Sequence, residues 1–315
     1  MMISMSEVKK AFGLNDNCIR KKMEEMIMRK KFAKLLGVVA TVTMMAFSMT
    51  ACGSSDSGST SGSGKSGDGE VKGTVTMAGS TSMEKLANAL AEGFMEKYDG
   101  VTVTAEFTGS SAGLESLAAG SVDIGNASRA LSDSEISGGA VENVVAIDGI
   151  AVITDSKNSV KEISSDDLKK IYTGEITNWS ELGGDDEAIV VIGREASSGT
   201  RGAFEELLDI EDQCKYANEL DSTGAVLAQV ASTEGAIGYV SLDVVDDSVI
   251  ALAIDGVEAN EANIVAGKYM LSRPFVMATM GEISEQSEVV QAFFEYIASE
   301  DGQEIIKKVG LILPE

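Results

Sequence analysis

The stretch Thr74–Phe107, "TVTMAGSTSMEKLANALAEGFMEKYDGVTVTAEF", contains a strand, a helix and a second strand in succession. Its two ends are rich in β-branched residues, whereas its middle has the alanine-rich and charged composition of a helix. A strand–helix–strand unit of this kind is the building block of a parallel sheet that is covered by helices. The stretch therefore predicts an α/β fold.

The same alternation continues along the rest of the chain. The sequence predicts further strands at residues 122–128, 144–155, 188–194, 235–242 and 272–280. It predicts helices at residues 111–121, 164–174, 199–208 and 223–233, and a helix pair at residues 287–310. The roughly 240 residues that follow residue 73 can bury one large core or two smaller ones. We find no internal repeat, and we expect two α/β lobes.

The residues before this domain have the pattern of an export signal. Met28–Cys52 contains a basic segment, an apolar run and small residues before a cysteine, which is typical of a secretion signal. Its "SMTAC" ending resembles the lipobox of bacterial lipoproteins, so we predict that residues 1–51 are removed and that Cys52 is lipidated. Translation is then expected to start at Met23, Met26 or Met28. An amphipathic N-terminal helix of a cytosolic protein is the alternative.

Residues 52–73 form the predicted link between the lipid and the domain. The segment from residue 53 to residue 73 contains 7 Gly and 7 Ser among 21 residues. Such a composition cannot form a core and is typical of a flexible tether, with a root-mean-square span of about 25 Å. The domain is therefore expected to be held near the membrane through its lipid anchor.

Charge and composition exclude several functions. The formal net charge is −25, and it becomes −30 without residues 1–51, which hold 9 basic and 4 acidic residues. This charge argues against nucleic acid as a partner. The absence of histidine excludes a Ser-His-Asp triad and a histidine metal site. The acidic loops at residues 183–188 and 244–249 lack EF-hand spacing, so solvated loops are expected and calcium binding is the alternative. We expect no cofactor.

The three cysteines do not predict a disulfide. Cys18 lies in the segment predicted to be removed, Cys52 is the predicted lipidation site, and Cys214 is left alone. An exported domain without a disulfide must be stabilised by its core.

Three turns share one sequence pattern and are the candidate binding residues of the domain. They are "AGSTSMEKL" (Ala78–Leu86), "TGSSAGLESL" (Thr108–Leu117) and "REASSGTRGAF" (Arg194–Phe204), and each leads from a strand into a helix. The first N–H groups of a helix have no partner within it and lie at the positive end of its dipole, so such a start attracts anions. Each turn alone is also explained by ordinary helix capping. Three together indicate an anion site at the carboxyl ends of the strands.

Arg194 leads the third turn and is the expected partner of a tetrahedral oxyanion, because its guanidinium forms forked hydrogen bonds. A surface ion pair is the alternative for this residue. None of the turns matches the G-x-x-x-x-G-K-[ST] loop of nucleotide hydrolases or a G-x-G-x-x-G fingerprint.

These motifs resemble those of the PstS family, the phosphate-binding lipoproteins of high-affinity phosphate ABC importers. The resemblance covers most of residues 74–314 and rests on "GSTSM", "GSSAGLESLAAGSVDIGNASRALSDSE", "DGIAVI", "LKKIYTGEITNWSELGG", "REASSGTRGAFEEL", "STEGAIGYVSL" and "LSRPF". The "IYTGEITNW" stretch, which contains the only tryptophan, Trp179, is among the more family-specific motifs. The resemblance implies a two-lobed type II solute-binding protein with a cleft between two α/β lobes.

The resemblance also implies where the lobes begin and end. One lobe is expected at about residues 74–146 and 271–315, and the other at about residues 152–252. The segments "DGIAVITD" and "RPFVMATM" are then the hinge strands between them, and phosphate is buried in the cleft when the lobes close.

Carried over motif by motif, the resemblance implies the phosphate ligands Ser80, Thr81, Ser82, Ser110, Arg194, Ser198, Gly199 and Thr200. One position departs from the family. After "DIG" some members place an aspartate that accepts the proton of phosphate, whereas this chain has Ser128 followed by Arg129. The departure implies that serine and arginine donors take that place.

A buried acceptor distinguishes protonated phosphate from sulfate. We consider Asp148 the first candidate for this acceptor and Glu195 the second. A turn-forming role is the alternative for Asp148.

The sequence predicts a monomeric receptor that is not an enzyme and that lies on the outer face of the cytoplasmic membrane. The resemblance implies that it binds inorganic phosphate and delivers it to the permease subunits of an ABC importer. A receptor for sulfate, molybdate or tungstate is the first alternative. An extracellular phosphatase with Ser198 or Thr200 as its nucleophile is the second.

Overall fold

A computed structural model describes residues 71–314, which belong to one structural unit, Gly67–Glu315. The predicted signal segment, the lipidation site Cys52 and most of the predicted tether lie outside the described residues. The first strand, β1, begins at Lys72, two residues before the start that the sequence predicts.

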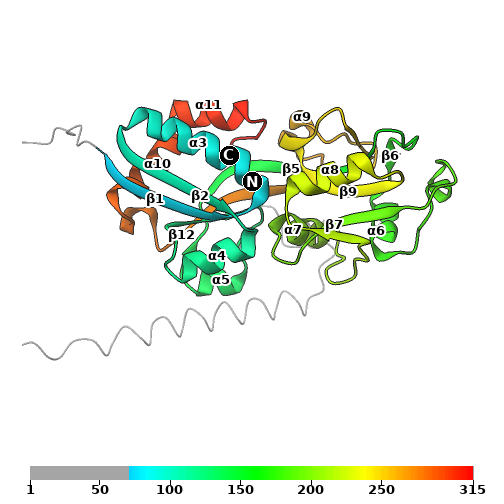
Figure 1. Ribbon diagram of the computed structural model, residues 1–315, viewed down its shortest axis with the longest axis horizontal. Coiled ribbons are helices and arrows are strands. Elements are labelled where there is room, and N and C mark those ends of the chain that lie inside the picture. The colour runs from blue at the N-terminus through cyan, green and yellow to red at the C-terminus, as the bar shows by residue number, and fades with distance from the viewer. Residues whose placement is uncertain (1–70, 315) are drawn as a thin grey trace, which may run out of the picture. The chain divides into compact units, whose positions relative to one another are not determined.

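A mixed ten-stranded sheet runs through both lobes (Figure 1). Its main strand order is β2-β1-β3-β12-β5-β9-β7-β8, while β4 pairs with β12 and β10 pairs with β5. The bounds of its strands are β1 (Lys72–Gly79), β2 (Gly100–Phe107), β3 (Ile124–Ala127), β4 (Ala140–Val141), β5 (Val144–Asp155), β7 (Val190–Arg194), β8 (Asn218–Leu220), β9 (Ala236–Ser241), β10 (Val249–Ala251) and β12 (Ser272–Met280). Strands β6 (Glu162–Ile163) and β11 (Ala253–Ile254) pair separately.

Strand β5 joins the two halves of this sheet. Its first part, up to Gly149, is antiparallel to β12, and its second part, from Ile150, is antiparallel to β9. One lobe therefore contains β1–β3, and the other contains β7–β9, with β5 and β12 between them (Figure 1). We name these lobe one and lobe two.

Helices cover both lobes, and none among residues 71–314 is long and apolar enough to cross a membrane. The α-helices are α3 (Glu84–Lys97), α4 (Ser110–Ala118), α5 (Asp133–Ser137), α6 (Ser165–Thr173), α7 (Gly199–Leu207), α8 (Thr223–Ser232), α9 (Glu261–Val265), α10 (Glu288–Ala298) and α11 (Glu300–Lys308). The short 3₁₀ turns are η2 (Thr81–Met83), η3 (Trp179–Leu182), η4 (Leu242–Val244) and η5 (Ile283–Glu285).

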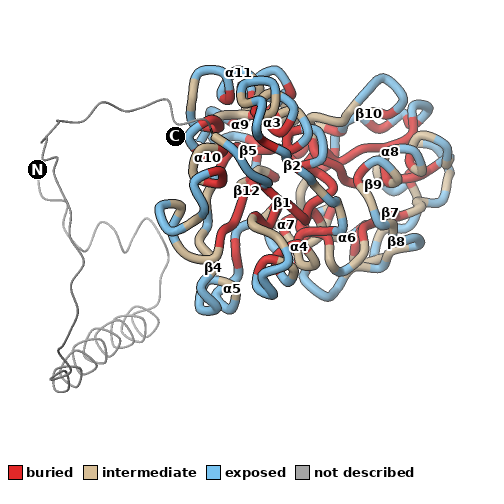
Figure 2. Tube along the Cα trace, turned by 60° about the vertical axis from the view of Figure 1, so that its left-hand side comes forward, coloured by how far each residue is buried: buried red, intermediate tan, exposed pale blue. Residues whose placement is uncertain are grey.

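Each lobe has its own buried core, and the buried strands lie inside a partly exposed shell (Figure 2). The largest cluster of lobe one packs α3, α10 and α11 on the sheet around Phe94 and Phe293. In lobe two Trp179 is 1% exposed, and its indole N–H donates to the carbonyl of Gly235 at 3.0 Å. Because each core is closed within its lobe, the polar loops between the lobes are free to form a site.

Parallel strand pairing determines where those loops meet. Strand β1 is parallel to β2 and β3, and β7 is parallel to β8 and β9. The carboxyl ends of parallel strands lie at the same edge of a sheet, which is where ligands bind in open α/β folds. The loops that follow β1, β2, β3, β7 and β8 therefore meet at the junction between the lobes.

Candidate functional site

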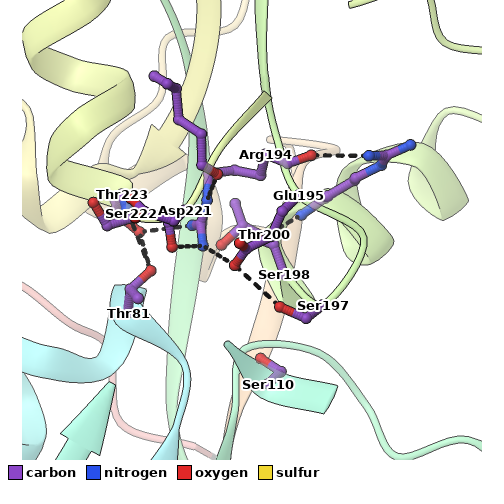
Figure 3. Close-up of polar contacts among 12 residues, drawn as sticks. Thr81, Ser110, Arg194, Glu195, Ser197, Ser198, Thr200, Asp221, Ser222 and Thr223 are labelled. Carbon is purple, nitrogen blue, oxygen red and sulfur yellow. Dashed lines mark hydrogen bonds and ion pairs between the residues drawn. The ribbon is translucent and has the colours of Figure 1, made fainter. Parts of the chain in front are cut away.

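Four helix starts, two from each lobe, meet between the lobes (Figure 3). Lobe one contributes the start of η2 with α3 and the start of α4, and lobe two contributes the starts of α7 and α8. Their hydroxyl side chains are almost fully buried, with Ser110 0% and Thr200 1% exposed. Such dense burial of polar side chains requires that they contact one another or a polar ligand.

The lobe-one side consists of three linked serines. The hydroxyl of Ser80 donates to Ser128 Oγ at 2.8 Å, and the N–H of Ser128 donates to Ser110 Oγ at 3.1 Å. Ser80 also caps η2, because its oxygen accepts from the N–H of Ser82. The structure thus brings together residues from the ends of β1, β2 and β3, as the sequence predicts.

The lobe-two side is the start of α7. Ser198 caps this helix by accepting from the N–H of Arg201 at 3.3 Å. Among the described residues, no group accepts from the N–H groups of Gly199 and Thr200 or from the hydroxyl of Ser198. These donors are therefore available to an anion.

Gly199 is required by the close approach of the lobes. A Cβ atom at this position would lie 2.2 Å from Ser110 Oγ and 2.9 Å from Ser128 Oγ. A side chain would therefore separate the two lobes at the point where the donors converge.

Hydrogen bonds across the cleft join the lobes. Ser82 Oγ lies 2.7 Å from Thr200 Oγ1 and 2.9 Å from Thr223 Oγ1. Thr81 Oγ1 lies 3.1 Å from Thr223 Oγ1, and it accepts from the N–H of Thr223 at 3.2 Å. In addition, the N–H of Ser111 donates to the carbonyl of Ser197 at 3.1 Å.

Arg194 supplies positive charge at this junction (Figure 3). It is 1% exposed, and its guanidinium donates to the carbonyls of Leu220 and Asp221, both at 3.0 Å, and to Thr223 Oγ1 at 3.2 Å. The nearest carboxylate is that of Glu195, 3.6 Å from Nη2. Burial lowers the pKa of Arg194 from its usual value. Since its close partners are neutral oxygens, its charge can attract an anion.

Glu195, the second candidate acceptor, is only partly buried. Its side chain is 34% exposed, and one oxygen accepts from the hydroxyl of Ser197 at 3.0 Å.

A polar network behind Arg194 holds its backbone. Arg201 Nη1 donates to the carbonyl of Arg194 at 2.9 Å, and the N–H of Arg194 donates to the hydroxyl of Tyr239 at 3.2 Å. Arg201 also pairs with Glu205 at 2.8 Å, and its guanidinium carbon lies 4.9 Å from the ring centroid of Tyr216. Arg201 therefore supports the third turn from behind.

Arg129 lies at the edge of the junction, where a Cβ atom on Gly202 of α7 would be 3.6 Å from its Cδ and where its Nη2 donates to Ser111 Oγ at 3.4 Å. Its guanidinium binds both carboxylate oxygens of Glu135, at 2.8 and 2.9 Å, and its side chain is 17% exposed. The chain turns at the end of β3, so Ser128 lies among the buried hydroxyls while Arg129 is held by helix α5. The guanidinium of Arg129 is thus paired with a carboxylate in this structure, and its role as a donor to phosphate stays a prediction.

Asp148 lies on the hinge strand β5 and pairs with Arg273 of β12. Both N–H groups of Arg273 that face it, Nε and Nη2, bind Asp148 Oδ2, at 3.0 and 2.8 Å. Arg273 Nη1 donates to the carbonyl of Ser128 at 3.1 Å and so links the pair to the lobe-one serines. The other oxygen, Asp148 Oδ1, is buried and has no hydrogen-bond partner. Burial raises the pKa of Asp148 to about 6, although Arg273 opposes the shift.

Sequence reasoning missed two residues of this junction. Thr223 follows "LDS" at a helix start of the same design as the three turns, but the preceding strand β8 has only three residues and little strand character. Arg273 lies in a strand predicted for the hinge, and an arginine in an otherwise apolar strand was the available signal.

Two chemical features were sought among the described side chains, a group of metal ligands and a reactive thiol. Among residues 71–314 no group of three His, Cys, Asp or Glu side chains could hold a metal ion. Cys214, the only cysteine described, is half-buried, and burial raises its pKa to about 11. The arrangement of neutral donors around one arginine is suited to binding an anion.

The fold and this junction define a type II solute-binding protein. Residues 64–301 match the model of the PBP superfamily domain. The chain is 36% identical over 284 residues to the phosphate-binding protein PstS of Bacillus subtilis, which covers 89% of this chain and 92% of that protein. It is 27% identical over 250 residues to the PstS of Borreliella burgdorferi, covering 76% of this chain and 89% of that protein.

Solved structures agree with these relatives. A phosphate ABC transporter substrate-binding protein of Clostridium perfringens with bound phosphate has a TM-score of 0.73 and 40% identity, over 77% of this chain and all of that one. A phosphate transport receptor of Vibrio cholerae has a TM-score of 0.66 and 32% identity, over 76% of this chain and all of that one. The chain belongs to the PstS family of phosphate-binding proteins. The predicted fold class and family are thereby confirmed.

Proposed function

We propose that the protein is an extracytoplasmic receptor that binds inorganic phosphate between its lobes and delivers it to an ABC importer. The observation that carries this proposal is the convergence of hydroxyls and free helix N–H groups from both lobes around Arg194. Its relatives include phosphate-binding proteins of more than one third sequence identity. Members of the family are receptors and not enzymes.

The proposed ligand set follows from burial and spare hydrogen-bonding capacity. The N–H groups of Thr81, Ser110, Gly199 and Thr200 have no acceptor among the described residues. Together with the hydroxyls beside them and one guanidinium, they can surround a tetrahedral anion on several sides. The proposed phosphate ligands are Ser80, Thr81, Ser82, Ser110, Ser128, Arg194, Ser198, Gly199 and Thr200.

Asp148 is the proposed acceptor that favours phosphate over sulfate. Its Oδ1 is buried without a partner, and Arg273 connects its carboxylate to Ser128. At neutral pH phosphate carries a proton that such an oxygen accepts, whereas sulfate carries none and is repelled.

The location and partners of the protein complete the proposal. Lipidation of Cys52 would anchor the chain to the outer face of the cytoplasmic membrane, and the predicted tether of residues 52–73 would leave the domain free to reach the permease. We propose that the protein acts as a monomer with lobes at about residues 74–146 with 271–315 and 152–252, and that the permease subunits receive phosphate when the lobes open.

A phosphatase activity has little support at the junction. Thr200 contacts Ser82, and Ser198 accepts from the N–H of Arg201, so no described side chain acts as a base on either hydroxyl. Absence of phosphate release from a chromogenic ester is the expected result.

Thermal unfolding with a panel of oxyanions tests the proposal. Phosphate at a concentration of about one hundred times its Kd is expected to stabilise the protein by about 2.7 kcal/mol, which raises its Tm by several degrees. Sulfate, molybdate and tungstate at the same concentration are expected to cause smaller shifts. A shift with sulfate but none with phosphate would overturn the proposal.

A further inference from the structure

Thr223 has a position that no proposed phosphate ligand shares. It is the first residue of α8, it is 3% exposed, and it belongs to lobe two. Its hydroxyl contacts Arg194 in its own lobe and Thr81 in the opposite lobe (Figure 3). It also contacts Ser82 in the opposite lobe. Thr223 therefore contacts both the buried guanidinium of Arg194 and the lobe-one turn that contains Thr81 and Ser82.

The hydrogen-bonding capacity of Thr223 is filled by these three contacts. A hydroxyl donates one hydrogen bond and accepts two. Arg194 Nη1 donates to Thr223 Oγ1 at 3.2 Å, which uses one acceptor position. The contacts with Thr81 Oγ1 at 3.1 Å and Ser82 Oγ at 2.9 Å use the remaining donor and acceptor positions. No capacity is left for phosphate, in contrast to the hydroxyl of Ser198.

The backbone of Thr223 strengthens the same connection. Its N–H donates to Thr81 Oγ1 at 3.2 Å, so one residue of lobe two is bound twice to one residue of lobe one. The preceding carbonyls of Leu220 and Asp221 accept from Arg194 at 3.0 Å each. The segment 220–223 thus orients the guanidinium and contacts the other lobe at the same time.

We propose that Thr223 is a positioning residue that couples lobe closure to the orientation of Arg194. When the lobes close, Thr81 and Ser82 complete the hydrogen bonds of Thr223 and hold its hydroxyl as an acceptor for Arg194. When they separate, two of its three hydroxyl contacts are lost, and the guanidinium loses a fixed acceptor. This inference rests on the proposed function, and it concerns the rate at which phosphate leaves the cleft.

The test compares the full chain with Thr223→Val, which keeps the branched shape, and Thr223→Ser, which keeps the hydroxyl. Calorimetry gives the Kd for phosphate, and rapid displacement of labelled phosphate gives its release rate. We expect Thr223→Val to release phosphate about tenfold faster, since each hydrogen bond among buried groups contributes measurably, with an association rate within about twofold of wild type. We expect Thr223→Ser to stay within about threefold of wild type.

Thr154→Val is the matched control. Thr154 is fully buried in β5, and its hydroxyl contacts only the carbonyl of Asp155, so it touches none of the four helix starts. Its phosphate release rate should equal that of wild type. If Thr223→Val does not fold, Thr223→Ala replaces it under the same criteria.

A second readout separates positioning from simple packing. In small-angle X-ray scattering at saturating phosphate, Thr223→Val should have a larger radius of gyration than wild type, while Thr223→Ser should match wild type. The inference would be overturned by an unchanged phosphate release rate in Thr223→Val. It would also be overturned if the valine and serine variants released phosphate equally faster than wild type. If the wild-type protein binds no phosphate, both the proposed function and this inference fail. If the wild-type protein binds phosphate and the variants release it at the wild-type rate, only the inference fails.

Discussion

The two buried arginines of the cleft, Arg194 and Arg273, differ in what neutralises them. Arg273 is 3% exposed and binds a carboxylate, Asp148, through two N–H groups. Arg194 is 1% exposed and donates its hydrogen bonds to two carbonyls and a hydroxyl, while the nearest carboxylate, that of the partly exposed Glu195, lies 3.6 Å from Nη2. A buried ion pair joined by hydrogen bonds is neutral as a unit, whereas an arginine that donates to neutral oxygens is balanced only in part by a more distant, partly exposed carboxylate. From this comparison we propose a structural role at the hinge for Arg273 and an anion-binding role for Arg194.

The largest expected effect concerns the stability of the hinge. Arg273→Met removes the partner of a buried carboxylate and should lower the free energy of unfolding by about 3–5 kcal/mol. Phosphate affinity of the folded protein should fall by no more than about tenfold. Urea unfolding and calorimetry measure the two quantities.

The double variant Asp148→Leu/Arg273→Met is the control for this prediction, because it removes both charges. It should recover at least half of the lost stability. If the single and double variants are equally unstable, the pairing of Asp148 with Arg273 is not the source of the loss.

The second effect concerns binding at the other arginine. Arg194→Met should weaken phosphate binding by about 3 kcal/mol or more, because it removes the charge that faces the anion. Its unfolding free energy should fall less than that of Arg273→Met, since no buried carboxylate loses its partner. Calorimetry should then show no heat of phosphate binding at micromolar protein concentration. Binding within about threefold of wild type would reverse the roles of the two arginines.

Three turns of the site could be predicted from the sequence. The turns of residues 78–86, 108–117 and 194–204 were recognisable because small and hydroxyl residues between a strand and a helix indicate a capped helix start at the end of a strand. The structure brings all three together. Their convergence depends on parallel strand pairing, which strand–helix alternation predicts.

Contacts between distant segments were less predictable. Arg273 binds a carboxylate 125 positions away, and Thr223 contacts residues more than 140 positions away. Nothing in the neighbouring sequence reveals such partners. Arg129 was assigned to the site by its position after β3, but one residue beyond a strand end the side chain points to a different partner, here Glu135.

The third effect is a pH dependence of stability that follows from the burial of Asp148. Burial raises its pKa to about 6 from the usual 3.8, so the folded protein holds this proton more tightly than the unfolded chain. The contribution of Asp148 to the free energy of unfolding should therefore decrease by about 2 kcal/mol as the pH rises from about 4 to about 6, and should stay constant above that. Asp148→Asn should lack this decrease when urea unfolding is compared at pH 4 and pH 7. Parallel pH profiles for the two proteins would contradict the prediction.

The fourth effect concerns selectivity. If Asp148 Oδ1 accepts the proton of bound phosphate, Asp148→Asn should reduce the ratio of phosphate to sulfate affinity by about tenfold or more. Glu195→Gln, at the more exposed candidate, should leave this ratio unchanged. Competition calorimetry with both anions measures the ratio. An intact preference in Asp148→Asn would remove Asp148 from the site.

The smallest expected effect comes from the surface charge. The chain carries a formal net charge of −25, and charges farther than about 8 Å are screened at physiological salt. The association rate of phosphate should therefore fall by a few-fold at low ionic strength, whereas its release rate should not change. An association rate that rises at low salt would mean that the local field of Arg194 dominates the approach of the anion.

The most direct test of the central claim is calorimetric titration of the full chain with phosphate and with sulfate at neutral pH. The buried Arg194 and the hydroxyl and N–H donors around it predict one bound phosphate per chain, and the proposed acceptor Asp148 predicts that sulfate binds at least about one hundredfold more weakly. The same titration of Arg194→Met should show neither anion binding, whereas Arg273→Met should still bind phosphate. Saturable binding of sulfate without binding of phosphate, or full phosphate binding by Arg194→Met, would contradict the account.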